Sequence, residues 1–162
     1  MKKAIAIGML GLALVSNRAA AQTAVERAQI LSEFQRSVVD YTQRHTGLDM
    51  FPGTLNAAAP APKIFTLPVA MVFRQLIADS LSGHDSAAIG GVGVPHRAAV
   101  LQPFPANELY DFPLLLADVL PPLPSPVEYR LIGNDLVIRD AEADVIVAVL
   151  RDAIGNATTV RR

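Results

Sequence analysis

The stretch that decides the fold spans residues 127–150 and reads VEYRLIGNDLVIRDAEADVIVAVL. Gly133 and Asn134 lie between two runs rich in β-branched and large apolar residues. A two-residue loop that begins with glycine is a hairpin signal, because glycine accepts the positive φ that the first loop position requires. If these two residues form the loop, the strand partners follow by counting outward. The predicted pairs are Leu131 with Leu136, Tyr129 with Ile138, and Glu128 with Arg139.

This register separates the side chains of the hairpin by polarity, because side chains alternate between the two faces of a strand. One face carries the apolar residues Tyr129, Leu131, Leu136 and Ile138. The other face carries the charged residues Glu128, Arg130 and Arg139. The opposed charges of Glu128 and Arg139 stabilise the pair by roughly 0.2–1 kcal/mol. A slip of one residue would mix the two sets, so the pattern specifies its own register.

A third apolar run, at residues 145–150, follows the acidic segment from Asp140 to Asp144. Its short length and four β-branched residues favour a strand over a buried helical segment. The sequence therefore predicts a three-stranded meander. Three short strands with one apolar face need cover from the rest of the chain.

The first predicted helix spans residues 23–45 and supplies part of that cover. Leu31, Phe34, Val38 and Tyr41 recur at intervals of three and four, which places them on one stripe. Thr23 is the predicted N-cap, with Glu26 as the partner in a capping box and Gly47 as the stop. The alternative is a partner-binding or coiled-coil helix. The stripe covers too few heptads for a coiled coil, which favours packing on the sheet.

The second predicted helix spans residues 66–82. Thr66 is its predicted N-cap, and Pro68 lies in the first turn, where its missing N–H costs little. Its broad apolar face consists of Val69, Val72, Phe73, Leu76, Ile77 and Leu81. We therefore expect an α+β fold, with two amphipathic helices packed on a small C-terminal antiparallel β-meander.

The remaining segments are rich in proline and glycine. Residues 51–62 read FPGTLNAAAPAP and are predicted to be a linker. Residues 83–126 form a long irregular segment, with a short strand expected within 94–102 and one or two helical turns within 114–120. The proline run at 121–126 is expected to guide the chain into the first strand. The alternative is a polyproline II surface for a partner, joined by Tyr110 and Phe112.

Residues 1–21 have the pattern of a secretory signal peptide. Lys2 and Lys3 precede an apolar run of 12 residues at 4–15, and Ala19-Ala20-Ala21 matches the small-residue cleavage site. The run is too short for a transmembrane helix, which needs about 20 residues. We expect cleavage near Ala21, export to the periplasm or medium, and a single domain over residues 22–162. The alternatives are a buried N-terminal core helix and an uncleaved membrane anchor.

Charge and cysteine content exclude several classes of function. Removal of residues 1–21 leaves 11 basic and 15 acidic residues, so a nucleic-acid partner is not expected. The chain has no cysteine, which excludes disulfides and the lipid attachment of a bacterial lipoprotein. We expect burial alone to stabilise the domain, and about 141 residues suffice for one core.

Two weak patterns point toward ligand binding. Residues 90–93 read GGVG, but no clear strand precedes them and Pro95 lies where a phosphate-binding loop would begin its helix. The three histidines are His45, His84 and His96. His84, Asp85 and His96 lie in one loop region and are too few for a well-formed metal site. We predict no metal or cofactor, with a metal or small-ligand site in residues 83–112 as the alternative.

Catalytic patterns are also incomplete. Ser80, Ser82, His84 and Asp85 are close in sequence, which raises a serine hydrolase as a further alternative. However, the chain has no G-x-S-x-G motif, and neighbours in sequence rarely form a triad. The carboxylates of Asp140, Glu142 and Asp144 suggest acid–base chemistry or calcium, but a solvated turn between strands is the favoured interpretation. We predict no catalytic residues.

Several segments together resemble a group of uncharacterised exported bacterial proteins with a signal peptide, helices and a proline-led hairpin. They are IFT at 64–66, VFRQLI at 72–77, LPPLP at 120–124, EYRLIG at 128–133 and DLVIRD at 135–140. Residues 127–150 alone are similar to the C-terminal hairpin of the periplasmic nickel/cobalt regulator family, through YR, the GND turn and a closing apolar strand. That likeness implies metal homeostasis, but this chain lacks a histidine-rich segment.

These observations predict an exported bacterial envelope protein that acts by non-enzymatic binding or structural association. An envelope protein is the expected kind of partner. Strand addition at the edge of the meander is one expected route for that contact.

Overall fold

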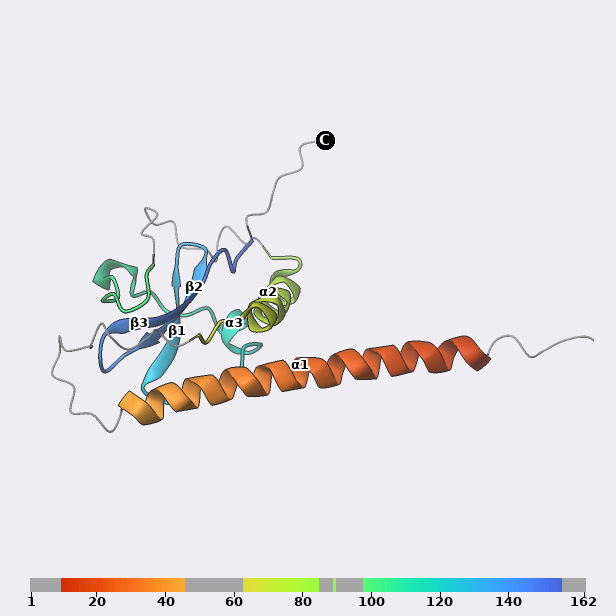
Figure 1. Cartoon of the computed structure of the whole chain (residues 1–162). Coiled ribbons are helices and arrows are strands. Elements are labelled where there is room, and N and C mark those ends of the chain that lie inside the picture. The colour runs from red at the N-terminus through yellow and green to blue at the C-terminus, as the bar shows by residue number, and fades with distance from the viewer. Residues whose placement is uncertain (1–9, 46–62, 85–88, 90–97, 156–162) are drawn as a thin grey trace, which may run out of the picture.

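The computed structural model describes residues 10–45, 63–84, 89 and 98–155 of the chain. The predicted linker at 51–62 and the GGVG segment at 90–93 lie outside these residues. The elements are α1 (Leu10–His45), α2 (Leu67–Leu81), the 3-10 turn η2 (Ala106–Glu108), α3 (Leu114–Ala117), β1 (Val127–Ile132), β2 (Asp135–Asp140) and β3 (Val145–Leu150). Helices precede a three-stranded antiparallel sheet, so the α+β class is confirmed (Figure 1).

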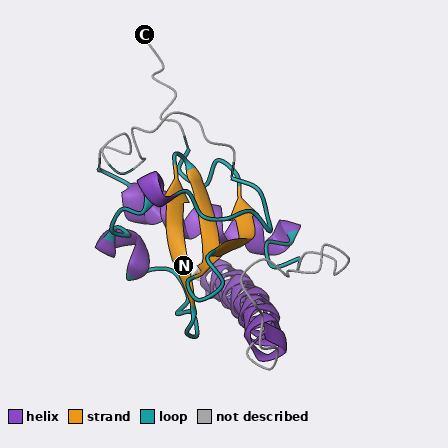
Figure 2. Cartoon of the chain, turned by 90° about the vertical axis from the view of Figure 1, so that its left-hand side faces the viewer, coloured by secondary structure: helices purple, strands orange, loops and turns teal. Residues whose placement is uncertain are grey.

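The sheet has the order β1-β2-β3, and the predicted register of its hairpin is confirmed. Leu131 pairs with Leu136, Tyr129 with Ile138, and Glu128 with Arg139. Gly133 has φ +57°, the conformation that motivated its place in the loop. β3 pairs with β2 through a register shift at Ile138 and Arg139. Figure 2 shows the three strands side by side.

The helices pack against one face of the sheet, here called the inner face. Phe34 of α1 and Phe73 of α2 are fully buried, with ring centroids 4.7 Å apart. Tyr129 of β1 reaches this cluster, 6.3 Å from Phe73 and 5.8 Å from Phe112. The predicted apolar stripe of the first helix and the apolar face of the hairpin therefore meet in one core.

The opposite face, here called the outer face, carries a second and smaller core. Its buried members are Ala98, Phe104, Ile132, Val137 and Ile146. The expectation of a sheet with a single apolar face was therefore wrong. Ile132 and Val137 share the face of the charged residues, and the segment from Ala98 to Phe104 covers them.

Two details of the predicted helices differ. α1 begins at Leu10, so Thr23 lies within the helix and is not its N-cap. Its 36 residues span about 54 Å at 1.5 Å per residue, and Figure 1 shows α1 extending well past the sheet. α2 lies one residue inside its predicted bounds at each end, with Thr66 in the N-cap position and Pro68 in the first turn. The Thr66 side chain makes no capping hydrogen bond. Its carbonyl accepts the N–H of Ala70 at 2.8 Å.

The short strand expected within 94–102 lies partly outside the described residues, which exclude 94–97. The described residues 98–102 contain a turn at 100–101 and no strand, and Pro103 makes an isolated bridge to Val145. The helical turn expected within 114–120 is α3. The proline run leads directly into β1, and the carbonyl of Pro121 accepts the Tyr129 hydroxyl at 2.9 Å. Phe112 stacks on Tyr129, whereas Tyr110 is exposed.

Candidate functional site

The two edges of the sheet differ in how their backbone groups are used. The first half of β3 is covered by the segment from Leu101 to Phe104. Leu101 N–H donates to the Ile146 carbonyl at 2.8 Å, and Ile146 N–H donates to the Gln102 carbonyl at 2.9 Å. Phe104 N–H donates to the Asp144 carbonyl at 3.2 Å. This segment therefore protects the first half of the β3 edge, because a covered edge cannot accept another strand.

β1 forms the other edge, and its register with β2 determines which of its residues direct their backbone N–H and C=O groups toward β2 and which direct them away. The Ala141 N–H donates to the Pro126 carbonyl at 3.0 Å, which continues the β1–β2 ladder by one pair. Even-numbered residues of β1 therefore bond to β2, and odd-numbered residues direct their N–H and C=O groups away from it. Val127 N–H bonds to the Pro124 carbonyl at 3.0 Å. Within the described part of the chain, the outward groups of Tyr129 and Leu131 have no backbone partner.

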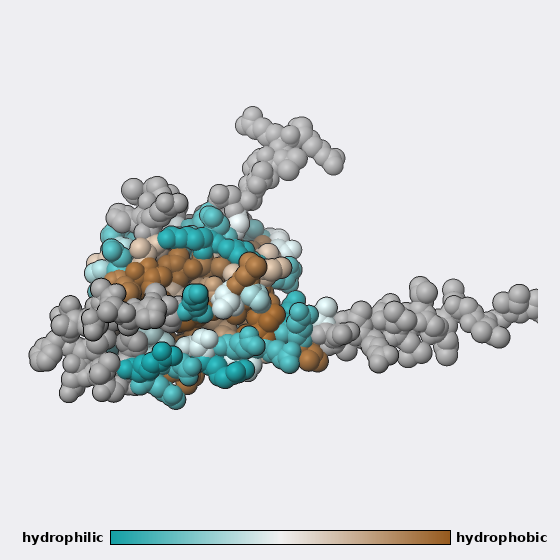
Figure 3. Space-filling model, viewed as in Figure 1, coloured by the Kyte–Doolittle hydropathy of each residue, from teal (hydrophilic) through white to brown (hydrophobic). Residues whose placement is uncertain are grey.

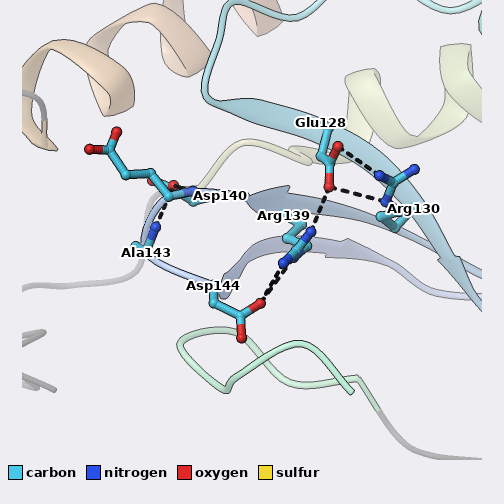
Figure 4. Close-up of polar contacts among 7 residues, drawn as sticks. Glu128, Arg130, Arg139, Asp140, Ala143 and Asp144 are labelled. Atoms are coloured by element: carbon cyan, nitrogen blue, oxygen red, sulfur yellow. Dashed lines mark hydrogen bonds and ion pairs between the residues drawn. The ribbon is translucent and has the colours of Figure 1, made fainter. Parts of the chain in front are cut away.

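Charged residues lie on the outer face beside this open edge (Figure 4). Glu128 accepts hydrogen bonds from Arg130 at 2.8 and 3.1 Å and from Arg139 at 2.8 Å. Arg139 also donates to Asp144 at 2.6 and 3.1 Å, and its guanidinium lies 5.3 Å from the centre of the Phe104 ring. The predicted Glu128–Arg139 pair is thus part of a four-residue network with two charges of each sign.

The network also perturbs the acid–base equilibrium of Arg139. Burial lowers its pKa, but the hydrogen bonds and charges of Asp144 and Glu128 outweigh that effect and raise the pKa above its ordinary value. Arg139 therefore stays positively charged, and it is held beside Glu128 of β1. A fixed cation fits a structural role better than a role in proton transfer.

The acidic turn is not uniformly solvated, which corrects the interpretation of Asp140. Its side chain is buried, and Figure 4 shows it at the start of the turn to β3. One carboxylate oxygen accepts the Tyr41 hydroxyl at 3.0 Å. The other accepts the N–H groups of Glu142 and Ala143 at 3.0 and 2.9 Å. Glu142 and Asp144 are exposed, as predicted.

The buried environment and the charge of Asp140 change the pKa of the Tyr41 hydroxyl. Burial, with the adjacent Asp140 charge and their hydrogen bond, raises the pKa of Tyr41 above its ordinary value. The pair links the end of α1 to the end of β2. The sequence does contain a signal for the burial of Asp140. Asp140 follows Leu136 and Ile138 at intervals of two residues, so it falls on the inner face of the strand.

The serine hydrolase candidates do not form a catalytic arrangement among the residues that the structure describes. The Ser80 hydroxyl donates to the Leu115 carbonyl at 2.9 Å, which joins α2 to α3. Ser82 and His84 are exposed where α2 ends. Asp85 lies outside the described residues.

The metal hypothesis is tested only in part. No group of three or more potential metal ligands occurs in the described ranges. His96 and Asp85 fall outside those ranges, as does the side chain of His45. The convergence of His84, Asp85 and His96 therefore stays a prediction.

Apolar surface is also exposed on the helical side. Figure 3 shows hydrophobic residues over the sheet and α2, above a hydrophilic band along α1. Leu67 and Met71, one turn apart on α2, are 74% and 63% exposed. A groove of about 410 Å³ runs beside α1, and its described lining consists of Thr23, Ala24, Arg27, Ala28 and Leu31. These features suit association with another molecule.

Comparison with known proteins finds no matching family model, no matching curated protein and no matching solved structure. Across the described helices, none combines the length and apolar character needed to cross a membrane.

Proposed function

We propose that this chain is an exported bacterial envelope protein that acts by binding a protein partner and not by catalysis. The open edge of β1 is the observation that carries the proposal, because Tyr129 and Leu131 present backbone donors and acceptors there. The signal-peptide pattern at residues 1–21 supports export. The likeness to exported bacterial proteins supports the same location.

Strand addition fits this edge for two reasons. An extended segment placed beside β1 gains backbone hydrogen bonds, each worth about 0.5–1.5 kcal/mol net. The β3 edge is covered over its first half, so the sheet offers β1 as the more accessible side. Ser80 and Asp140 hold elements of the fold together, which supports a binding role over a catalytic one.

The test compares two substitutions at Leu131 in the protein expressed from its full sequence. Leu131→Pro removes the outward N–H but no hydrogen bond to β2, because the backbone N–H of Leu131 points away from β2. Leu131→Ala keeps the N–H and removes only side-chain packing. Each tagged protein is cross-linked in cells, and the captured envelope proteins are identified by mass spectrometry.

We expect the natural protein and Leu131→Ala to capture the same partner, and Leu131→Pro to lose it. Equal capture by the proline variant would remove the β1 edge from the proposal. Failure of the natural protein to capture any partner, itself included, would overturn the binding function.

A further inference from the structure

The partner that best fits the β1 edge is a second copy of β1. This inference rests on the proposed binding function and names its partner. An antiparallel strand related by a two-fold axis places the same residues on both sides of the contact. The question is whether any register satisfies the backbone groups and the side chains together.

The alternation of inward and outward backbone groups along β1 limits the registers in which two copies can pair. Only odd-numbered residues of β1 direct their N–H and C=O outward, so hydrogen-bonded pairs across the axis must join odd with odd. Three registers of this kind keep most of the strand paired. Their axes pass through Glu128, Tyr129 or Arg130.

The charges on the outer face distinguish these three registers. An axis at Glu128 places that carboxylate opposite its own copy, and an axis at Arg130 opposes two guanidinium groups. An axis at Tyr129 instead places Glu128 of each chain opposite Arg130 of the other. Like charges directly opposed are destabilising and opposite charges are stabilising, so the Tyr129 register alone is complementary.

The Tyr129 register also suits the other groups on the strand. Glu128 and Arg130 fall in non-hydrogen-bonded pairs, where side chains come closest. On the inner face, Val127 of each chain lies opposite Leu131 of the other, which extends the apolar surface across the axis. Four backbone bonds form: Tyr129 N–H to Tyr129 carbonyl twice, and Leu131 N–H to Val127 carbonyl twice. The Val127 N–H, already bonded to Pro124, is not needed.

We propose that the protein forms a two-fold symmetric dimer through antiparallel pairing of β1 with β1, with Tyr129 on the axis. The two sheets then join into one six-stranded sheet. Glu128 and Arg130 set the register, and the charged network of each chain continues across the contact.

The decisive experiment exchanges charges between two variants of the full chain. Glu128→Lys opposes two cations across the axis twice, and Arg130→Glu opposes two anions twice. Each variant alone should dimerise about tenfold or more weakly than the natural protein, measured by sedimentation equilibrium. An equimolar mixture of the two restores both opposite-charge pairs, and we expect it to form a heterodimer.

The mixture distinguishes a defect at the dimer interface from a defect in folding. Both substitutions also disturb the bonds that Glu128 makes within its own chain, and mixing cannot repair a folding defect. A natural protein that dimerises while the mixture forms no heterodimer would overturn the Tyr129 register.

A second measurement follows hydrogen exchange at single amides. The outward N–H groups of Tyr129 and Leu131 should become protected as the natural protein is concentrated, whereas those of Glu128 and Arg130 should be protected throughout. A natural protein that stays monomeric up to millimolar concentration would overturn the dimer. If such a monomer still captured an envelope protein through its β1 edge, the proposed binding function would stand without self-association.

Discussion

Replacing Tyr41 by phenylalanine removes one hydroxyl from the contact between α1 and the sheet and leaves the ring in place. The hydroxyl donates to Asp140 at 3.0 Å, and the two residues are only 4% and 3% exposed. Among the described residues, the remaining donors to Asp140 are the N–H groups of Glu142 and Ala143 on the other carboxylate oxygen. The substitution therefore takes one of the three donors that the described residues offer to this buried carboxylate.

The magnitude follows from the charge and burial of the acceptor. A hydrogen bond to a charged group contributes about 1.5–3 kcal/mol, roughly twice the value for a neutral pair. Because water has little access to Asp140, it cannot readily replace the lost donor. We expect Tyr41→Phe to lower the free energy of unfolding by about 2 kcal/mol.

Urea unfolding followed by circular dichroism measures this loss, with an unchanged dependence on urea concentration as the sign that only stability has changed. Tyr110→Phe is the matched control, because Tyr110 is 66% exposed and the same hydroxyl is removed. Its effect should stay within about 0.5 kcal/mol. If both variants lost the same free energy, or if Tyr41→Phe lost less than about 0.5 kcal/mol, the hydrogen bond to Asp140 would not be holding α1.

Three further predictions concern pH, Ser80 and export. Burial raises the pKa of both Tyr41 and Tyr129 above the ordinary value of about 10, so their stabilising effect is complete below that pH and is lost as pH rises above it. Above about pH 10, ionisation of these two tyrosines should lower the free energy of unfolding by about 2.7 kcal/mol for each pH unit. Tyr41→Phe should halve this slope, measured by urea unfolding at several pH values. An unchanged slope would contradict the burial argument. Ser80→Ala should cost about 1 kcal/mol by removing the bond between α2 and α3, whereas His84→Ala, at an exposed site, should change stability by less than about 0.5 kcal/mol. Mass spectrometry of protein from the periplasm or medium should find an N-terminus directly after Ala21, and a cytoplasmic protein that keeps residues 1–21 would refute export.

The hairpin was predictable because its signals are local and agree with one another. Gly133 permits the loop conformation, and the alternation of apolar and charged residues allows only one register. The pair Glu128–Arg139 then follows by counting. The same local patterns predicted α2 and the apolar stripe of α1.

Asp140 was misjudged because its environment depends on a residue 99 positions away. Composition favours solvent for an acidic turn, and only the strand parity of Asp140 argued for the inner face. Even with that parity, nothing local identifies Tyr41 as the donor. Long-range polar pairs of this kind follow from the packing of elements and not from the pattern of any one element.

The second core was missed for a related reason. Ile132 and Val137 share a face with Glu128 and Arg139, and the charges dominated the interpretation of that face. Two adjacent apolar residues on a nominally polar face signal that some segment covers them. The irregular segment supplies that cover through Phe104, which also lies beneath the Arg139 guanidinium.

The placement of α1 reconciles its early start with the predicted cleavage. Among the α1 side chains that the structure describes, those that pack on the main core begin at Ile30, and those from 23 to 29 are all exposed. Cleavage after Ala21 would therefore shorten the helix without removing any of these core contacts. Thr23 would then lie near the new terminus, where its side chain and that of Glu26 suit the capping box predicted from sequence. The described contacts between α1 and the main core all come from the part of the helix that such a cleavage would retain.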